Sequence, residues 1–140
     1  MEIRALGPGD DEAVVAAQHL FDGPARADAT ARFLAEPGSH LLVGYVDGEP
    51  AGFVSGVEVT HPDKGTELFL YELAVDEAHR RRGHARALVE ALADLALERG
   101  CVGMFVFVDD DNEAGRAAYR SAGGRDASRP WMVDWTFVRF

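Results

Sequence analysis

Runs of apolar residues with two different periods alternate along the chain and indicate which elements it forms. Residues 84–99 carry Leu88, Leu92 and Leu95 at helical spacing. Residues 102–108 are almost wholly apolar, which is typical of a strand covered on both faces. The pattern predicts strands at 3–6, 40–46, 50–59, 67–75, 102–108, 125–128 and 131–140. It predicts helices at 11–21, 25–35, 84–99 and 112–122.

Turn signals between these runs indicate how the strands pair. Asp47-Gly48 predicts a tight antiparallel hairpin, and Gly100 predicts the end of the long helix. The strand, helix and strand over 67–108 predict a parallel, right-handed crossover. We therefore expect an α/β fold with a mixed, mostly antiparallel central sheet and helices on both faces. No repeat or linker interrupts residues 1–140, so a single domain is expected.

Composition narrows the class of protein. Apolar residues make up 47% of the chain, which argues against disorder, and no apolar run is long enough to span a membrane. The first residues lack the basic and apolar blocks of a signal peptide, so a cytoplasmic protein is expected. Cys101 is the only cysteine and the histidines lack zinc spacing, so neither a disulfide nor a metal site is expected.

The charge of the chain bears on its partners. A formal net charge of -10 repels phosphate backbones and anionic lipids, so nucleic acid and membranes are not expected partners. A cationic small molecule or peptide fits the charge better. The acidic residues could equally serve solubility alone.

One basic turn contrasts with this acidic chain. Arg80, Arg81, Arg82 and Gly83 stand between an apolar strand and the long helix that begins near His84. Free N–H groups and the helix dipole make a helix start an anion site, and glycine lets a phosphate approach the backbone. The alternative is a solvated basic turn that has no ligand.

This turn resembles the signature of the GNAT superfamily of N-acetyltransferases, which is Arg or Gln, two residues, Gly, one residue, then Gly or Ala. Arg80, Gly83 and Ala85 match it. A second signature of that family, Asn, then Tyr seven residues later and Gly four after that, is matched by Asn112, Tyr119 and Gly123. Gly115 and Gly124 depart from the family's usual residues.

The resemblance implies acetyl-coenzyme A as cosubstrate and a strand, before the turn, that a bulge splays from its neighbour. It implies that Tyr119 protonates the leaving thiolate, whereas packing of its ring is the alternative role. The residues that the resemblance assigns to coenzyme A are Leu73, Ala74, Val75, Arg80, Arg81, Arg82, Gly83, His84, Ala85, Asn112 and Tyr119.

Glu72 is the candidate base, because an amine must lose a proton to accept an acetyl group. It lies in an otherwise apolar strand, and strand alternation places it on one face with Leu68, Leu70 and Ala74. Partial burial would raise its pKa, which suits a base. The alternative is that Glu72 pairs with an arginine elsewhere.

A group of aspartates follows the fifth apolar strand. Asp109, Asp110 and Asp111 lie at the carboxyl end of that strand, where parallel sheets bind ligands, and could attract a cationic substrate there together with Asp134. The first three could equally form a polar loop in which Asp111 or Asn112 caps the next helix.

Tyr71-Glu72-Leu73-Ala74-Val75, the basic turn and the acidic loop are also similar to the small aminoglycoside 3-N-acetyltransferases. That resemblance favours acetyl transfer to a primary amine of a cationic small molecule, in particular an aminoglycoside, by direct transfer. The alternatives are a peptide or protein N-acetyltransferase and a non-catalytic acetyl-coenzyme A-binding module. Aromatic residues near the C-terminus favour a homodimer: Trp131, Trp135, Phe137 and Phe140.

Overall fold

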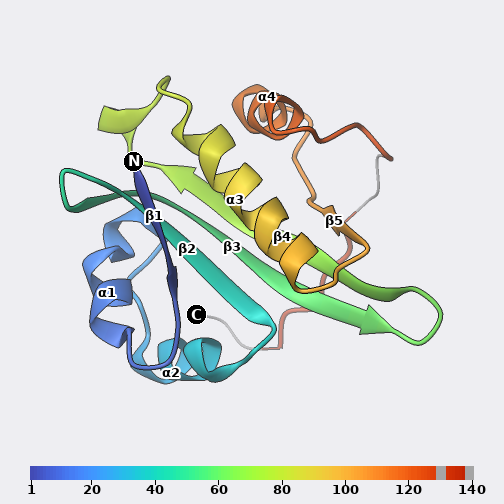
Figure 1. Cartoon of the computed structure of the whole chain (residues 1–140), viewed down its shortest axis with the longest axis horizontal. Helices are drawn as coiled ribbons and strands as arrows, with labels where there is room; N and C mark the ends of the chain where they lie inside the picture. The colour runs from blue at the N-terminus through green and yellow to red at the C-terminus, as the bar shows by residue number, and fades with distance from the viewer. Residues whose placement is uncertain (129–131, 138–140) are drawn as a thin grey trace.

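The structure, a computed structural model that describes residues 1–128 and 132–137, contains a sheet flanked by helices (Figure 1). The strands are β1 (Glu2–Leu6), β2 (Ser39–Val46), β3 (Glu49–His61), β4 (Gly65–Val75) and β5 (Gly103–Phe105). The α-helices are α1 (Asp11–Ala16), α2 (Ala27–Ala35), α3 (His84–Glu98) and α4 (Glu113–Ser121). Single turns of 3₁₀ helix occupy Gln18–Leu20 and Glu77–His79.

The strands follow one another across the sheet in chain order, β1-β2-β3-β4-β5. Every neighbouring pair is antiparallel except β4 and β5, which are parallel and connected through α3. The predicted mixed, mostly antiparallel α/β sheet is confirmed.

Two apolar layers hold the helices on opposite faces of this sheet. On one face, Leu88 and Leu92 of α3 pack with Leu42 of β2. On the other face, Val14 of α1 and Leu34 of α2 belong to a second cluster. Alternation along each strand divides its side chains between the two layers, and helices on both faces follow from that alternation.

The predicted turns form as expected. Asp47 and Gly48 have φ values of 50° and 80°, the conformation of a tight turn that matches the twist of a hairpin. Gly100 has a φ of 79°, donates to the carbonyl of Leu97, and is followed by Cys101, which donates to Ala96. This pair of bonds is a Schellman motif, which ends α3 where the sequence predicts.

Several predicted boundaries are wrong. The helix expected over 11–21 breaks after Ala16, and the following turn brings Phe21 edge-on to Phe53, with 4.9 Å between ring centroids. The strand expected over 102–108 is paired only at Gly103–Phe105.

The two predicted C-terminal strands do not form in residues 125–128 or 132–137, and Trp131 and 138–140 lie outside the described residues. Trp135 and Phe137 are 73% and 90% exposed. Aromatic residues favour strands only where their side chains can pack against a neighbouring strand. The described chain offers residues 132–137 no such strand.

Membrane-spanning helices and metal-binding clusters are the subject of two findings on residues 1–128 and 132–137. None of the helices there is long and apolar enough to cross a membrane. Nor do three or more His, Cys, Asp or Glu side chains gather there in a group that could hold a metal ion.

Candidate active site

A bulge in β4 determines which side chains face the site. Ser55 of β3 lies opposite Glu72, and the next residue, Gly56, lies opposite Leu70. Tyr71 is therefore an extra residue on β4, and an extra residue reverses the faces of all that follow it. Leu68 and Leu70 pack in the α3 layer, whereas Glu72 lines a cavity on the opposite face.

The alternation predicted from sequence is thus wrong for Glu72 with respect to Leu68 and Leu70. Ala74 does share the face of Glu72, since it packs against the α1 and α2 layer. The run of apolar residues predicts the strand, but the position of a bulge within such a run cannot be predicted from its sequence.

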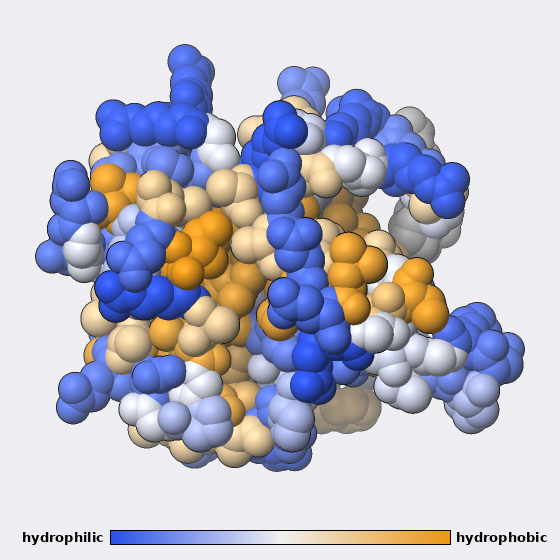
Figure 2. Space-filling model, viewed as in Figure 1, coloured by the Kyte–Doolittle hydropathy of each residue, from blue (hydrophilic) through white to orange (hydrophobic). Residues whose placement is uncertain are grey.

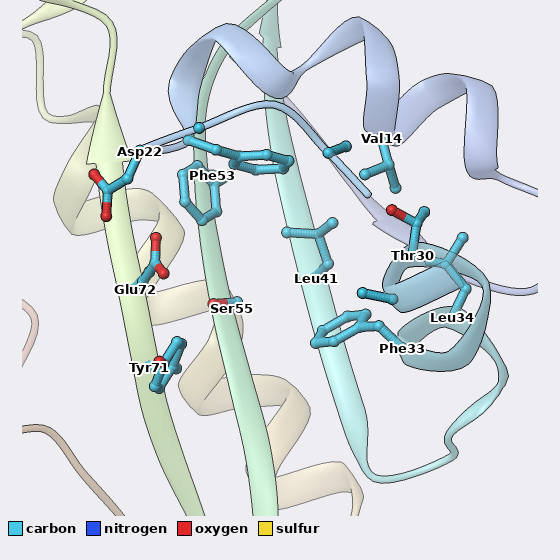
Figure 3. A pocket seen from close by; sticks show the side chains of 14 residues that line it. Val14, Asp22, Thr30, Phe33, Leu34, Leu41, Phe53, Ser55, Tyr71 and Glu72 are labelled. Atoms are coloured by element: carbon cyan, nitrogen blue, oxygen red, sulfur yellow. The ribbon is translucent and has the colours of Figure 1, made fainter. Parts of the chain in front are cut away.

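The cavity lies between the sheet and helices α1 and α2, and its volume is about 390 Å³ (Figure 3). That volume is in the range of small-molecule sites. Most of its lining is apolar, with Phe33 of α2 and Phe53 of β3 among the larger side chains. Its acidic groups are Glu72 and Asp22.

Glu72 and Asp22 share one end of this cavity. Figure 3 shows their carboxylates facing the same space. Burial, and then the negative charge of Asp22, raise the pKa of Glu72 above its ordinary value. A carboxylate with a raised pKa is a better proton acceptor, and such groups gather at functional sites.

The end of β4 beyond its short pairing with β5 forms a free edge. β5 pairs with Glu67, Leu68 and Phe69 only, while β4 continues to Val75. Leu73 and Val75 pack against the α3 layer, and Ala74 packs against the other. Backbone groups on that edge between Leu70 and Val75 face no neighbouring strand of the described chain, and the carbonyl of Val75 accepts from Nε of Arg80. The other groups on this edge can pair with an extended ligand.

The basic turn leads from this edge into α3. Arg80, Arg81 and Arg82 are exposed, and none takes part in the ion pairs found among the described residues. Arg80 donates through Nε to the carbonyl of Val75 at 3.2 Å. Gly83 has a φ of 78°, and no side chain caps the first N–H groups of α3. Uncapped N–H groups beside unpaired arginines suit a phosphate.

Two histidines flank this turn. Burial, and then the positive charges of the N-terminus, His79 and Arg82, lower the pKa of His84. His84 is therefore neutral at physiological pH. The Nδ1 atom of His79 is buried and has no hydrogen-bond partner among the described residues. An unpaired buried polar atom at this place is consistent with a ligand site.

Tyr119 lies on α4 and packs against the same layer as Leu73 and Val75. Burial raises the pKa of its hydroxyl, so it keeps its proton at neutral pH. The ring therefore does pack against the sheet, and this role does not exclude proton donation.

Asn112 caps α4, since its Oδ1 accepts from the N–H of Gly115 at 2.9 Å. A Cβ atom added to Gly115 would lie 2.5 Å from Nδ2 of Asn112, so the amide could not keep this position above any other residue. A Cβ atom on Gly124 would lie 2.9 Å from the carbonyl of Tyr119, which explains the second departure from the family pattern.

The predicted acidic residues do not join the cavity. Asp109, Asp110, Asp111 and Asp134 are exposed, and none lines it. The loop forms backbone turns, with the N–H of Asn112 donating to the carbonyl of Asp109 at 3.0 Å. Of the two caps considered for the next helix, Asn112 is the one used.

Sequence reasoning missed several residues of the cavity. Asp22 stands in an irregular segment between two helices, where a carboxylate normally indicates only solvent exposure. Sequence reasoning assigns Tyr71 no role of its own, and its place in the bulge brings it into the lining together with Glu72. The helical spacing of Phe33 indicates only a residue of the helix core, not one that lines a cavity.

Comparison with known proteins gives the following matches. The acetyltransferase (GNAT) family matches residues 12–123. A mycothiol acetyltransferase of Clavibacter sepedonicus is 37% identical over 101 residues, 72% of this chain and 32% of that protein. An L-2,4-diaminobutyric acid acetyltransferase of Streptomyces coelicolor is 36% identical over 83 residues, 59% of this chain and 48% of that protein. The chain spans about half the length or less of these relatives.

Among solved structures, the aminoglycoside acetyltransferase HMB0005 from an uncultured soil metagenomic sample is 26% identical, with a TM-score of 0.80. The match covers 96% of this chain and 98% of that one. Another aminoglycoside acetyltransferase, meta-AAC0020 in complex with sisomicin, has a TM-score of 0.89 at 17% identity over 97% and 95% of the two chains. At that identity the likeness concerns the fold alone.

Proposed function

The chain belongs to the acetyltransferase (GNAT) family, and from that premise we propose that it moves an acetyl group from acetyl-coenzyme A to a primary amine of a cationic small molecule. The observation that carries the proposal is the placement of Glu72. Its carboxylate lines a cavity on one face of β4, in the part of the strand whose outer edge is unpaired. An amine in the cavity and a thioester along that edge would meet at β4.

The residues proposed to hold coenzyme A come from three places in the fold. Backbone groups of Leu73, Ala74 and Val75 offer hydrogen bonds to an extended arm. The turn from Arg80 to Ala85 offers N–H groups, an open glycine and positive charge to a pyrophosphate, supported by its unpaired arginines. Asn112 is proposed to contribute through its Nδ2 group, because its Oδ1 is occupied in capping α4.

The raised pKa of Glu72 and the raised pKa of Tyr119 support the proton transfers that we propose for these two residues. Glu72 accepts a proton from the ammonium, which frees the nitrogen lone pair for direct attack on the acetyl group that acetyl-coenzyme A supplies. The C–S bond then breaks, and Tyr119, which its raised pKa keeps protonated, donates its hydroxyl proton to the leaving sulfur. The second proton of the attacking nitrogen returns to the tyrosine oxygen as the amide forms. Cys101 is buried, and burial raises the pKa of its thiol, which favours direct transfer over an acyl-cysteine route.

Aminoglycosides are a candidate acceptor class, since several structural relatives are named aminoglycoside acetyltransferases. One such relative is named for the 6′ amine, so the likeness favours no ring position. Asp109, Asp110, Asp111 and Asp134 are proposed to attract a cation from outside the cavity. A peptide acceptor and a non-catalytic role remain the alternatives. A single domain, a homodimer and a cytoplasmic location remain predictions.

The test measures thiol release from acetyl-coenzyme A across a panel of amines. Glu72→Gln keeps the shape of the side chain and cannot take the proton, so kcat should fall by about 100-fold to 10,000-fold. Glu67→Gln, a change in the same strand outside the cavity, is the matched control and should leave kcat unchanged. Binding of acetyl-coenzyme A, measured by calorimetry, should persist in both variants. Wild-type turnover by Glu72→Gln would refute the proposed base.

A further inference from the structure

We infer that the acceptor carries one ammonium group on a compact apolar body, and that Asp22 is the second carboxylate that holds this ammonium. The inference rests on the proposed function and narrows its substrate class. It follows from the unequal distribution of polar and apolar groups around the cavity.

The polar end of the cavity suits a single cation. Glu72 from β4 and Asp22 from the segment before α2 face the same space (Figure 3). Asp22 already acts electrostatically on Glu72, so a cation placed there interacts with both carboxylates. One ammonium can satisfy both, whereas a second ammonium further along the same molecule would enter the apolar part.

The rest of the cavity offers little to a hydroxylated body. Phe21 lies edge-on to Phe53, and Phe33, Leu34 and Leu41 continue the apolar wall. The remaining polar side chains of the lining are Thr30, Ser55 and Tyr71, and the first two are only 9% and 8% exposed. Sugar hydroxyls buried against the phenyl rings would lose their hydrogen bonds to water without replacement.

The charges around the cavity also exclude an acidic acceptor. No Lys, Arg or His belongs to the described lining. An amino acid would place its carboxylate beside two carboxylates in a cavity whose described lining offers no cation, and like charges repel. An amino acid such as diaminobutyrate therefore fits poorly, whereas an alkylamine or arylalkylamine fits.

The apolar surface continues past the cavity along β4. Tyr71 lines the cavity and meets Phe69 edge-on, with 5.7 Å between ring centroids, and Phe69 stacks on Phe105 at 5.1 Å. An acceptor longer than the cavity would therefore meet aromatic rings as it leaves, which again favours an apolar body. Figure 2 shows the other face of the sheet, where hydrophilic side chains surround apolar areas near α3.

The test compares two acceptors of the same length. Hexylamine and 1-amino-1-deoxyglucitol share a six-carbon chain and one primary amine, but in the second every remaining carbon carries a hydroxyl. We expect kcat/KM for hexylamine to be higher by about 100-fold or more, because several hydroxyls would be buried unpaired. 2,4-Diaminobutyrate and tobramycin complete the panel and should rank with the hydroxylated amine.

One variant tests the role of Asp22, and a second serves as its control. Asp22→Asn should raise KM for hexylamine by about tenfold and leave the Kd of acetyl-coenzyme A unchanged. Glu12→Gln, which removes the same charge from α1 outside the cavity, should change neither value. An unchanged KM in Asp22→Asn would overturn the role given to that residue.

Calorimetry on the coenzyme A-loaded protein separates this inference from the proposed function. If hexylamine binds more tightly than the aminoglucitol but no amine releases thiol, acetyl transfer is refuted and the inferred pocket preference stands. If tobramycin, diaminobutyrate or the aminoglucitol is the preferred acceptor, acetyl transfer stands and the inference is overturned. Absence of hexylamine binding also overturns it.

Discussion

Gly83 offers a sharp test of the coenzyme A site, because the chain contains a matched control for it. Gly83 precedes α3 with a φ of 78°, and Gly100 follows α3 with a φ of 79°. A Cβ atom added at either position would have no atom within 4 Å. Replacing each glycine by alanine therefore applies the same backbone perturbation at the two ends of one helix.

The cost to stability should be similar in the two variants. A non-glycine residue in the left-handed region costs roughly 1–2 kcal/mol, and alanine recovers about 0.4–1 kcal/mol by restricting the unfolded chain. The free energy of unfolding should therefore fall by about 1 kcal/mol. For a domain of this size, that corresponds to a decrease of about 3–5 °C in Tm.

The effect on acetyl-coenzyme A should differ. At Gly83 the new methyl group would occupy the open space in front of the uncapped N–H groups of α3 and displace a phosphate from them. Losing one hydrogen bond to a charged group costs about 1.5–3 kcal/mol, which is roughly a 10-fold to 100-fold increase in Kd. Gly100→Ala should leave Kd unchanged.

Calorimetry with acetyl-coenzyme A and thermal unfolding of both variants make the comparison. Equal Kd values for wild type and a folded Gly83→Ala protein would refute the pyrophosphate assignment. An equal loss of affinity in both variants would show that the strain, and not the position, weakens binding.

The other predictions concern the proton transfers and the core. Tyr119→Phe removes only the buried hydroxyl, so kcat should fall by about 100-fold while calorimetry finds the Kd of acetyl-coenzyme A unchanged; full turnover would leave Tyr119 a packing role only. Asp22→Asn should move the acid limb of the kcat/KM profile to lower pH, because loss of the negative charge lowers the raised pKa of Glu72; an unmoved limb would contradict this. Leu68→Ala, at a core position only 1% exposed, should lower the free energy of unfolding by about 2–5 kcal/mol in urea titrations, whereas a loss below 1 kcal/mol would contradict its core role.

The sheet and the main helices were predictable because long periodic runs and glycine turns act locally. The helical spacing of Leu88 and Leu92 and the turn at Asp47-Gly48 each correspond to an observed element. The C-terminal strands were not predictable, because strand formation depends on a partner edge that propensity does not describe.

The sequence predicts which residues belong to the site better than it predicts how they are arranged. Glu72 stood out as a carboxylate in an apolar run, yet its face depends on the bulge at Tyr71, which pairing with β3 creates. The role of Asp22 could not be predicted, because it depends on Glu72, which lies on a strand far away in the sequence. Gly115 departs from the family's usual residue, and the reason lies in the amide of Asn112, which packs against it in the folded chain.

The short pairing of β5 lowers the free energy at which the backbone opens locally. Three paired residues, Gly103–Phe105, and one hydrogen bond from the N–H of Val102 to the carbonyl of Thr66 at 2.8 Å join this segment to β4. The described chain after α4 adds no further strand. A segment held by so few ladder bonds opens at a lower free energy than the central strands. Amide protons from β5 to α4 should therefore exchange with deuterium before those of β3, and acetyl-coenzyme A should slow this exchange by linking the edge of β4 to α4.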